Sequence, residues 1–316
     1  LQVDLLVVVK REHKLEKYTL NHVSENFLKE RKADLPIKKM FRNYEIGTPE
    51  AITEIGEYCV QDTHLPLRLM NKLAIVPNLV EMAKATWVPM SFIYERGQGI
   101  KVFSQLLKET RELNMVVKTF TKDNSTDDSE YEGATVLAAK TGAYMEGPVT
   151  GLDFASLYPT IIRAHNICPS TFVIDEKFTK NNESETYREV NINENKKYRL
   201  AQSIPGVFPK MLEKLATNRK AAKKQKAEAY KNGDEFMVDV YEGKQLAFKV
   251  SMNSMYGFLG ARKGMIPCLP CAESTTFIGR EMIEHTQNKV LEWYPGSNIV
   301  YGDTDSVMVQ FPMDGK

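Results

Sequence analysis

Two aspartates separated by a single residue, and flanked by short apolar runs, constrain this 316-residue chain more than any other feature. The segment Gly302-Asp303-Thr304-Asp305 between apolar residues 299–301 and 307–309 is typical of a β-hairpin tip. Such a tip presents both carboxylates together, and hard divalent cations are the obvious means of offsetting their repulsion. A solvated turn is the simpler alternative, because Asp and Gly are common in turns. An EF-hand calcium loop is excluded, since its required glycine would fall at Met308.

A second segment places another carboxylate at the end of an apolar strand. Asp153 follows that strand, and a tight turn closed by Tyr158-Pro159 comes next. This geometry can hold a carboxylate beside a row of backbone N–H groups, which suits phosphate oxygens. An ordinary strand end with a buried tyrosine is the alternative.

A third segment predicts an antiparallel helical hairpin over residues 208–256, with its turn at Asn232-Gly233-Asp234 and its end at Gly257 and Gly260. In the first arm, Arg219 and Lys223 are four residues apart and share a helical face. In the second arm one face carries a cation, an amide and an aromatic ring: Lys249, Asn253 and Tyr256. These groups can hold a phosphate and a base, although a solvated charged face is the alternative for the first arm.

Taken together, the three segments indicate phosphoryl or nucleotidyl transfer. Three carboxylates can share a pair of divalent ions, and the cations of the hairpin can stabilise charge on leaving phosphates. A glycosyltransferase with an Asp-x-Asp metal site is one alternative, but it leaves Asp153 and the basic hairpin unexplained. A nucleic-acid-binding remnant without catalysis is another, although all three carboxylates are present.

Composition narrows the partners only a little. The net charge is +1 at pH 7, so any surface for nucleic acid has to be local. No apolar run approaches the roughly 18 residues of a membrane span, so no membrane partner is expected. Four cysteines are too few for a disulfide framework, and a reducing compartment is expected. Cys268 and Cys271 have metal-ligand spacing but no second pair, which favours a structural role.

The remaining pattern predicts mostly helix before residue 86, with a helix start at Thr48-Pro49 and a break or kink at Pro66. Residues 5–9 suit a buried strand. Further expectations are a polar acidic loop at 123–132, strand, turn, short helix and strand over 149–173, a surface hairpin or loop at 175–197, a helix at 272–293, and a strand, turn and strand over 298–310.

Three motifs resemble those of family B (alpha-like) DNA-directed DNA polymerases. Residues 153–159 (DFASLYP) resemble the motif D-x-x-S-L-Y-P, residues 249–257 (KVSMNSMYG) match K-x-x-x-N-S-x-Y-G, and residues 301–306 match Y-G-D-T-D-S. Tyr58 and Asp62 resemble the third proofreading-exonuclease motif, Y-x-x-x-D, and residues 131–134 (YEGA) are similar to Y-x-G-G/A. The resemblance is greatest to the delta-like branch and to polymerases of large eukaryotic DNA viruses.

The resemblance implies an α+β (mixed α/β) fold cut from a longer protein. Residues 1–85 would be the carboxyl-terminal part of a ribonuclease H-like 3′-5′ exonuclease domain, and 86–203 a linker and the first part of a palm with an antiparallel sheet. Residues 204–258 would be helical-hairpin fingers, and 259–316 the second part of the palm. The thumb and the first two exonuclease motifs would lie outside the chain, so we expect weak or no polymerase activity and no proofreading from these residues alone.

The resemblance also implies template-directed DNA synthesis with two Mg²⁺ ions, for which Mn²⁺ can substitute. The partners would be primer–template DNA, deoxynucleoside triphosphates and, through missing regions, a sliding clamp. The location would be intracellular, in the nucleus or at a viral replication site in the cytoplasm. The implied metal ligands are Asp153, Asp305, Asp303 and the Phe154 carbonyl.

The other implied roles concern the nucleotide and the template. The amides of Ser156, Leu157 and Tyr158 would face the triphosphate, and the Tyr158 ring would exclude a 2′-hydroxyl. Arg219, Lys223 and Lys249 would hold phosphates, with Lys249 also assisting pyrophosphate departure, while Asn253 and Tyr256 would line the base-pair pocket. Tyr131 and Gly133 would contact template.

Overall fold

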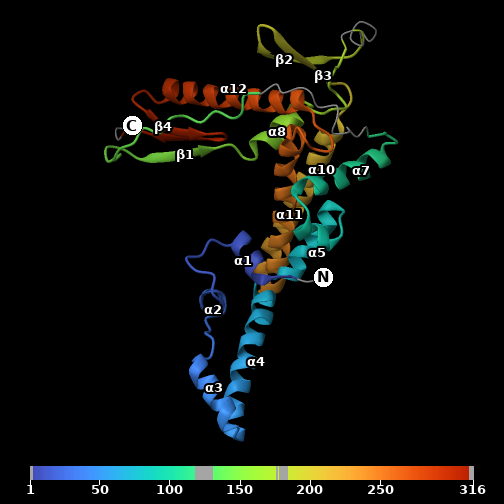
Figure 1. Cartoon of the computed structure of the whole chain (residues 1–316). Coiled ribbons are helices and arrows are strands. Elements are labelled where there is room, and N and C mark those ends of the chain that lie inside the picture. Colours follow the sequence, from blue (N-terminus) through green and yellow to red (C-terminus); the bar gives the residue numbers. More distant parts are fainter. Residues whose placement is uncertain (1–2, 118–130, 176, 178–183, 313–316) are drawn as a thin grey trace. The chain divides into compact units, whose positions relative to one another are not determined.

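The computed structural model describes residues 3–117, 131–175, 177 and 184–312 (Figure 1). The chain divides into two compact units. The first unit comprises residues 1–83 with 222–244, and the second comprises residues 84–221 with 245–316. The predicted acidic loop falls largely outside the described residues, since its positions 123–130 are among those omitted.

The amino-terminal part of the chain is helical, as the sequence predicts. Its helices are α1 (Leu5–Glu12), α2 (Leu20–Leu28), α3 (Ile37–Ile46), α4 (Pro49–Lys72) and α5 (Ile75–Thr86). Thr48 caps α4 as predicted, because its side chain accepts a hydrogen bond from the Ala51 N–H at 3.4 Å. Val9, Val23 and Leu69 form a buried cluster that joins α1, α2 and α4.

One prediction for this region is wrong, and another is wrong in part. Residues 5–9 belong to helix α1, not to a strand; Asp4 accepts a hydrogen bond from the Leu6 N–H at 2.9 Å and starts the helix. Val8 and Val9 are buried whereas Leu6 and Val7 are exposed, so the apolar run has a helical face. Of the break or kink predicted at Pro66, the break does not occur, because α4 continues through Pro66 to Lys72.

The predicted helical hairpin is confirmed as α10 (Val207–Lys231) and α11 (Glu235–Gly260), each of which contributes residues to both units. Gly233 adopts a φ of 70° in the connecting turn, a conformation that favours glycine. Hydrogen bonds from Lys226 to Glu242 and from Arg219 to Gln245 link the two antiparallel arms. Gly257 does not end α11, which continues to Gly260.

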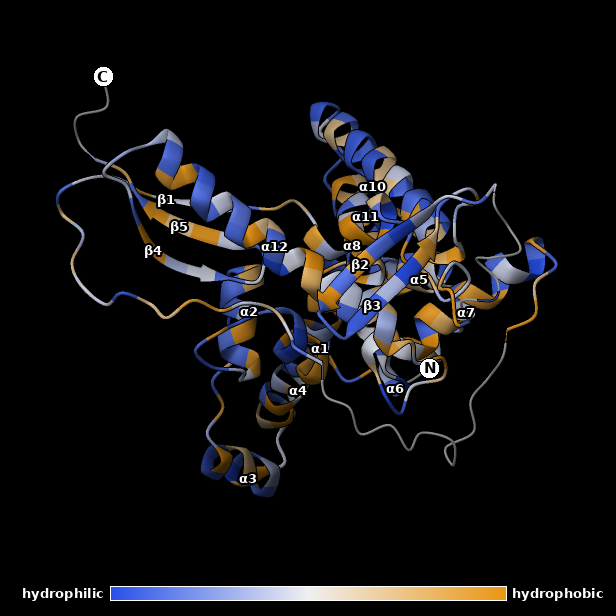
Figure 2. Cartoon of the chain, turned by 90° about the horizontal axis from the view of Figure 1, so that it is seen from above, coloured by the Kyte–Doolittle hydropathy of each residue, from blue (hydrophilic) through white to orange (hydrophobic). Residues whose placement is uncertain are grey.

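The main sheet of the second unit has the strand order β1-β5-β4 and is entirely antiparallel. Its strands are β1 (Val149–Asp153), β4 (Asn298–Asp303) and β5 (Ser306–Gln310), and the last two confirm the predicted hairpin. Helix α12 (Leu269–Trp293) packs on β5 through Ile283, Val290, Val307 and Val309. Figure 2 shows β5 as a largely hydrophobic strand beside α12.

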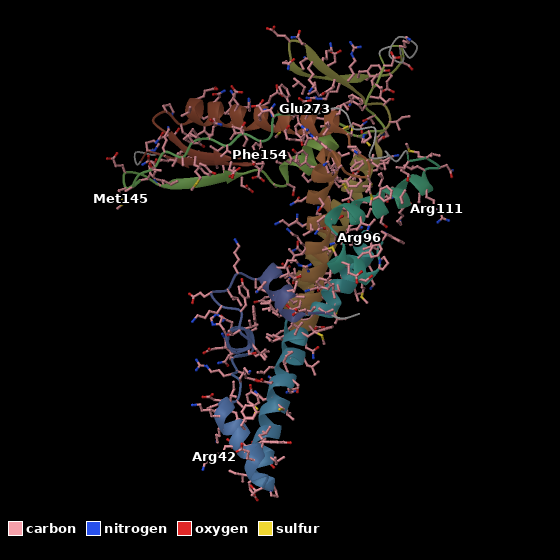
Figure 3. All side chains as sticks on the ribbon, in the orientation of Figure 1. Arg42, Arg96, Arg111, Met145, Phe154 and Glu273 are labelled. Atoms are coloured by element: carbon pink, nitrogen blue, oxygen red, sulfur yellow. The ribbon has the colours of Figure 1, made fainter. Side chains whose placement is uncertain are left out.

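The other elements of the second unit are α6 (Met90–Glu95), α7 (Gln98–Glu112), α8 (Leu157–Ala164) and the antiparallel pair β2 (Tyr187–Asn193) and β3 (Lys196–Ala201). The polar segment at 175–197 therefore includes a hairpin, as predicted, that extends to residue 201. The strand predicted to end at 173 is absent from the described residues; Phe172 forms only an isolated bridge with Leu200. Both Lys196 and Tyr198 contact the buried Glu273 of α12 at 2.7 Å. Figure 3 labels Glu273 on α12.

Among the described residues, none of the helices combines the length and the apolar character that crossing a membrane requires.

Candidate active site

Three aspartates from two separated segments meet at one end of the main sheet. Asp153 ends β1 and Asp303 ends β4, and both are paired in register with Ser306, the first residue of β5. The Phe154 N–H donates to the Asp305 carbonyl at 2.8 Å, which fixes the turn after β1 against the β4–β5 turn. The antiparallel order thus brings together carboxylates that are 150 residues apart in sequence.

The tip that carries Asp303 and Asp305 is held from its open edge. Thr304 adopts a φ of 52°, in the left-handed region that only a turn accommodates readily. Its N–H donates to the Thr135 carbonyl at 3.0 Å, and Val136 forms a bridge with Asp303. The segment that follows residue 134 therefore pairs with the end of β4 and fixes the turn that carries the two aspartates.

The electrostatics of this sheet end suit a cation. Burial raises the pKa of Asp305 above its ordinary value, and the charges of Asp153 and Asp303 raise it further. The Asp303 carboxylate accepts a hydrogen bond from the Thr304 hydroxyl at 2.8 Å. A divalent cation would relieve the repulsion between these carboxylates, so the donor set fits hard metal ions.

The described residues contain no cluster of three or more His, Cys, Asp or Glu side chains arranged to enclose a metal. Magnesium is commonly held by only one or two carboxylates together with substrate phosphates. The arrangement of Asp153 and Asp305 therefore fits an ion whose coordination the substrate completes.

The raised pKa of Asp305 predicts a pH-dependent stability in buffer without divalent cations. The folded state favours the protonated form of Asp305. The contribution of Asp305 to the free energy of unfolding is therefore fully present below its unfolded pKa of about 4, and it is lost as pH rises through its folded pKa. Asp305→Asn should therefore raise the Tm relative to the unaltered chain near neutral pH, and this difference should shrink towards about pH 4. Thermal unfolding across that range checks it, with the exposed Asp239→Asn as control; a difference independent of pH would contradict it.

Helix α8 begins directly after this cluster. Its N-cap residue, Ser156, adopts a φ of 58° and makes no side-chain capping bond. The first N–H groups of a helix have no partner within the helix, which makes them ready donors for phosphate. Leu157 is buried and anchors this first turn. The role predicted for the amides of Ser156, Leu157 and Tyr158 stays a prediction.

Three tyrosines from three different motifs form one aromatic cluster beside α8. The rings of Tyr158 and Tyr256 lie 4.5 Å apart, and the hydroxyls of Tyr131 and Tyr256 lie 3.2 Å apart. Burial raises the pKa of both Tyr158 and Tyr256, so both phenols stay neutral at physiological pH. The structure therefore brings together the predicted sugar-selecting, base-pair and template residues.

Two residues of α12 that the sequence analysis missed support this cluster. Arg280 donates to the carbonyls of Glu132 and Gly133 at 2.8 and 2.7 Å and so anchors the segment that carries Tyr131. A Cβ at Gly279 would lie 3.1 Å from the Tyr158 ring, closer than such contacts normally are. Both residues lie inside a regular helix, where no local sequence pattern distinguishes them.

The face of α11 that is predicted to bind the nucleotide is largely exposed to solvent. Lys249 and Asn253 are exposed and Tyr256 is half-buried, one helical turn after another. Lys249 is therefore not buried, although its apolar neighbours in sequence suggested a less exposed setting. On α10, the Arg219 side chain donates to Gln245 at 3.2 Å, and Lys223 is exposed in the first unit.

The predicted exonuclease residues lie together on α4 in the first unit. Lys32 forms an ion pair with Asp62 at 2.7 Å, and its ammonium lies 3.3 Å from the Tyr58 hydroxyl. The hydrogen bond that Lys32 donates to Asp62 raises the pKa of Lys32. The second Asp62 oxygen is buried and has no hydrogen-bond partner among the described residues. Lys32 was missed because it lies 30 residues before Asp62, outside any motif.

Comparison with known proteins establishes the class to which this sheet end and helical hairpin belong. The family model described as DNA polymerase family B matches residues 88–316, so the chain belongs to DNA polymerase family B. The family assignment confirms the predicted resemblance and excludes the glycosyltransferase alternative.

Individual relatives agree with this assignment. The chain is 45% identical over 319 residues to a DNA polymerase of Paramecium bursaria Chlorella virus NY2A, covering 99% of this chain and 34% of the relative. It is 40% identical over 328 residues to the DNA polymerase delta catalytic subunit of Candida albicans, covering 98% and 30%. The chain thus spans about a third of the length of these curated relatives.

The fold agrees as well. The structure of the family B DNA polymerase from the archaeon Pyrobaculum calidifontis matches with a TM-score of 0.68 and 25% identity, covering 98% of this chain and 39% of that one. The predicted mixed α/β class with small antiparallel sheets is confirmed.

Proposed function

We propose that this chain carries the catalytic centre of a template-directed DNA polymerase, which adds deoxynucleotides to a primer 3′-hydroxyl. The observation that carries the proposal is the convergence of Asp153, Asp303 and Asp305 at one sheet end, beside the start of α8. Membership of DNA polymerase family B supports it independently.

In this proposal, Asp153, Asp305 and the Phe154 carbonyl hold the two Mg²⁺ ions, and Asp303 is the third, less direct ligand. When bound, the ions stabilise charge on the attacking and leaving oxygens. The raised pKa of Asp305 is consistent with this role, because a carboxylate crowded by two others binds a cation favourably. Mn²⁺ would be accepted by the same oxygen ligands.

The remaining residues bind and orient the nucleotide. The first amides of α8 receive triphosphate oxygens, and Arg219, Lys223 and Lys249 neutralise the phosphates, with Lys249 donating to the departing pyrophosphate. Asn253 and Tyr256 line the base-pair pocket, while Tyr131 and Gly133 contact the template. The anchoring of Gly133 by Arg280 supports a fixed position for that template contact.

The proposed domains follow the same assignment: exonuclease remnant 1–85, linker and palm 86–203, fingers 204–258 and palm 259–316. Proofreading through Tyr58 and Asp62 would need carboxylates outside this chain, and a sliding clamp would bind through other segments. Replication in the nucleus or at a cytoplasmic viral site is the setting that the two groups of relatives support.

Primer extension tests the proposal directly. A protein that contains these residues together with the segments expected on either side should extend a primer with Mg²⁺ and the four deoxynucleotides, and should follow the template. Extension that ignores the template, or none with a correctly folded protein, would contradict the proposal.

Lys249→Ala should lower kcat/KM for the incoming nucleotide by about 10²–10³-fold, because it removes an exposed cation from the triphosphate. Arg219→Ala should mainly raise KM, since its guanidinium already bonds to Gln245. Single-turnover kinetics separates the two effects, and the exposed Lys231→Ala is the matched control. A loss confined to primer–template affinity would place this face on DNA instead.

A further inference from the structure

Two cysteines at the start of α12 have no part in the proposed function. Cys268 is the N-cap residue of the helix and Cys271 lies in its first turn. Their Sγ atoms are 3.0 Å apart, and both thiols are free. A disulfide has an S–S distance of about 2.05 Å, so a shift of roughly 1 Å between the sulfurs would bring them to bonding distance.

The two thiols are chemically unequal. Cys268 is partly exposed, whereas Cys271 has no exposed surface. The hydrogen bond with Cys271 lowers the pKa of Cys268, while burial raises the pKa of Cys271. A partly exposed cysteine of lowered pKa beside a buried thiol is the arrangement of a nucleophilic cysteine with a resolving partner.

A metal site explains the pair less well. Among the described residues, no third His, Cys, Asp or Glu completes a cluster that could hold an ion. Cys168 is the other buried cysteine of this unit, but its sulfur receives hydrogen bonds from Ser170 at 3.1 Å and from the Phe208 N–H at 3.5 Å. Its pKa is raised by burial, which disfavours the thiolate that a metal requires.

We propose that Cys268 and Cys271 form a redox-active dithiol that reacts with low-molecular-weight disulfides. The Cys268 thiolate attacks one sulfur of the small disulfide, forms a mixed disulfide and expels one thiolate. Cys271 passes its proton to that leaving thiolate and attacks the Cys268 sulfur, which expels the second small thiolate. This thiolate takes up from solvent the proton that Cys268 released when it ionised. Two protein thiols are thereby oxidised, and one small disulfide is reduced to two thiols.

The position of this dithiol gives its oxidation a structural consequence. The Cys268 N–H donates to the Leu259 carbonyl at 2.8 Å, so the N-cap of α12 is fixed to the last turn of α11. Tyr256 lies one turn earlier on α11. In a reducing compartment such a disulfide would be transient, as is usual for redox-sensing pairs.

Oxidised glutathione is the probe for the test, applied to the folded 316-residue chain with peptide mapping by mass spectrometry. We expect the peptide with both cysteines to lose about 2 Da and to keep no glutathione. With Cys271→Ser, glutathione should remain attached to Cys268. Cys59 is exposed and alone, so it provides an internal comparison, and Cys59→Ser is the matched control that should leave the Cys268 reaction unchanged.

We expect Cys268 to react about tenfold faster than Cys59, because the hydrogen bond with Cys271 lowers the pKa of Cys268 and so favours its reactive thiolate. Lasting glutathione on Cys268 in the unaltered chain would overturn the proposal, and so would reaction of Cys59 ahead of Cys268. Both measurements are independent of polymerase activity. They would therefore distinguish failure of the dithiol from failure of the proposed function.

Discussion

Asp305→Ala is expected to abolish primer extension, with a loss of at least about a thousandfold in kcat. The substitution removes one of the carboxylates that meet at the sheet end. It keeps the hydrogen bond from the Phe154 N–H, because that bond goes to the backbone carbonyl of residue 305, which alanine also has. Preorganised charge at the reacting phosphate is usually the largest single contribution to such a rate, so its loss is costly. Asp153→Ala should have the same effect. The effect of Asp303→Ala on extension should be less uniform than that of the other two substitutions, because the Asp303 carboxylate already accepts a hydrogen bond from Thr304.

The same experiment separates a catalytic loss from unfolding. Since the pKa of Asp305 is raised, removing its charge should leave the chain at least as stable at neutral pH, and a thermal melt would show this. Asp239→Ala, an exposed carboxylate on α11, is the matched control and should retain extension. Near-normal rates after Asp305→Ala would remove the basis for the proposed centre.

The elements that the sequence predicts best are those with strong local signals. The hairpin turn at Asn232-Gly233-Asp234 and the Thr48-Pro49 helix start combine residues with a defined backbone preference, and both are confirmed. The sequence does not predict the helix at residues 5–9, because five consecutive apolar residues carry no periodicity. There the Asp4 cap and the packing of Val9 with Leu69 decide for helix.

For the candidate site too, the local motifs are predictable from the sequence, whereas the contacts between distant segments are not. Each motif could be read from its residues, but their meeting depends on β1 pairing with β5 across more than 150 residues of chain. The sequence does not predict a role for three further residues, Arg280, Gly279 and Lys32. Their roles depend on contacts with residues that are distant in the sequence. Gly279 illustrates this, since its value is the space that it leaves for the ring of Tyr158.

Tyr158→Ala is expected to admit ribonucleotides while deoxynucleotide incorporation is at least partly retained. The Tyr158 ring is positioned by Tyr256 at 4.5 Å on one side and by the close approach of Gly279 on another. With these two neighbours the Tyr158 ring has little room to move away from an added 2′-hydroxyl. A steric clash between the ring and a ribonucleotide is an effective means of discrimination. We expect the preference for deoxynucleotides to fall by about 10²–10³-fold, which corresponds to roughly 3–4 kcal/mol.

Competition between each ribonucleotide and its deoxynucleotide in single-nucleotide extension measures this preference. Tyr158→Phe is the informative control, because it keeps the ring and its packing on Tyr256 and should keep most of the discrimination. Gly279→Ala should displace the Tyr158 ring, since the new Cβ would lie 3.1 Å from it, and should alter the preference without touching the substrate. If Tyr158→Ala leaves the preference unchanged, Tyr158 acts only in packing, and the selection against ribose has to come from another residue.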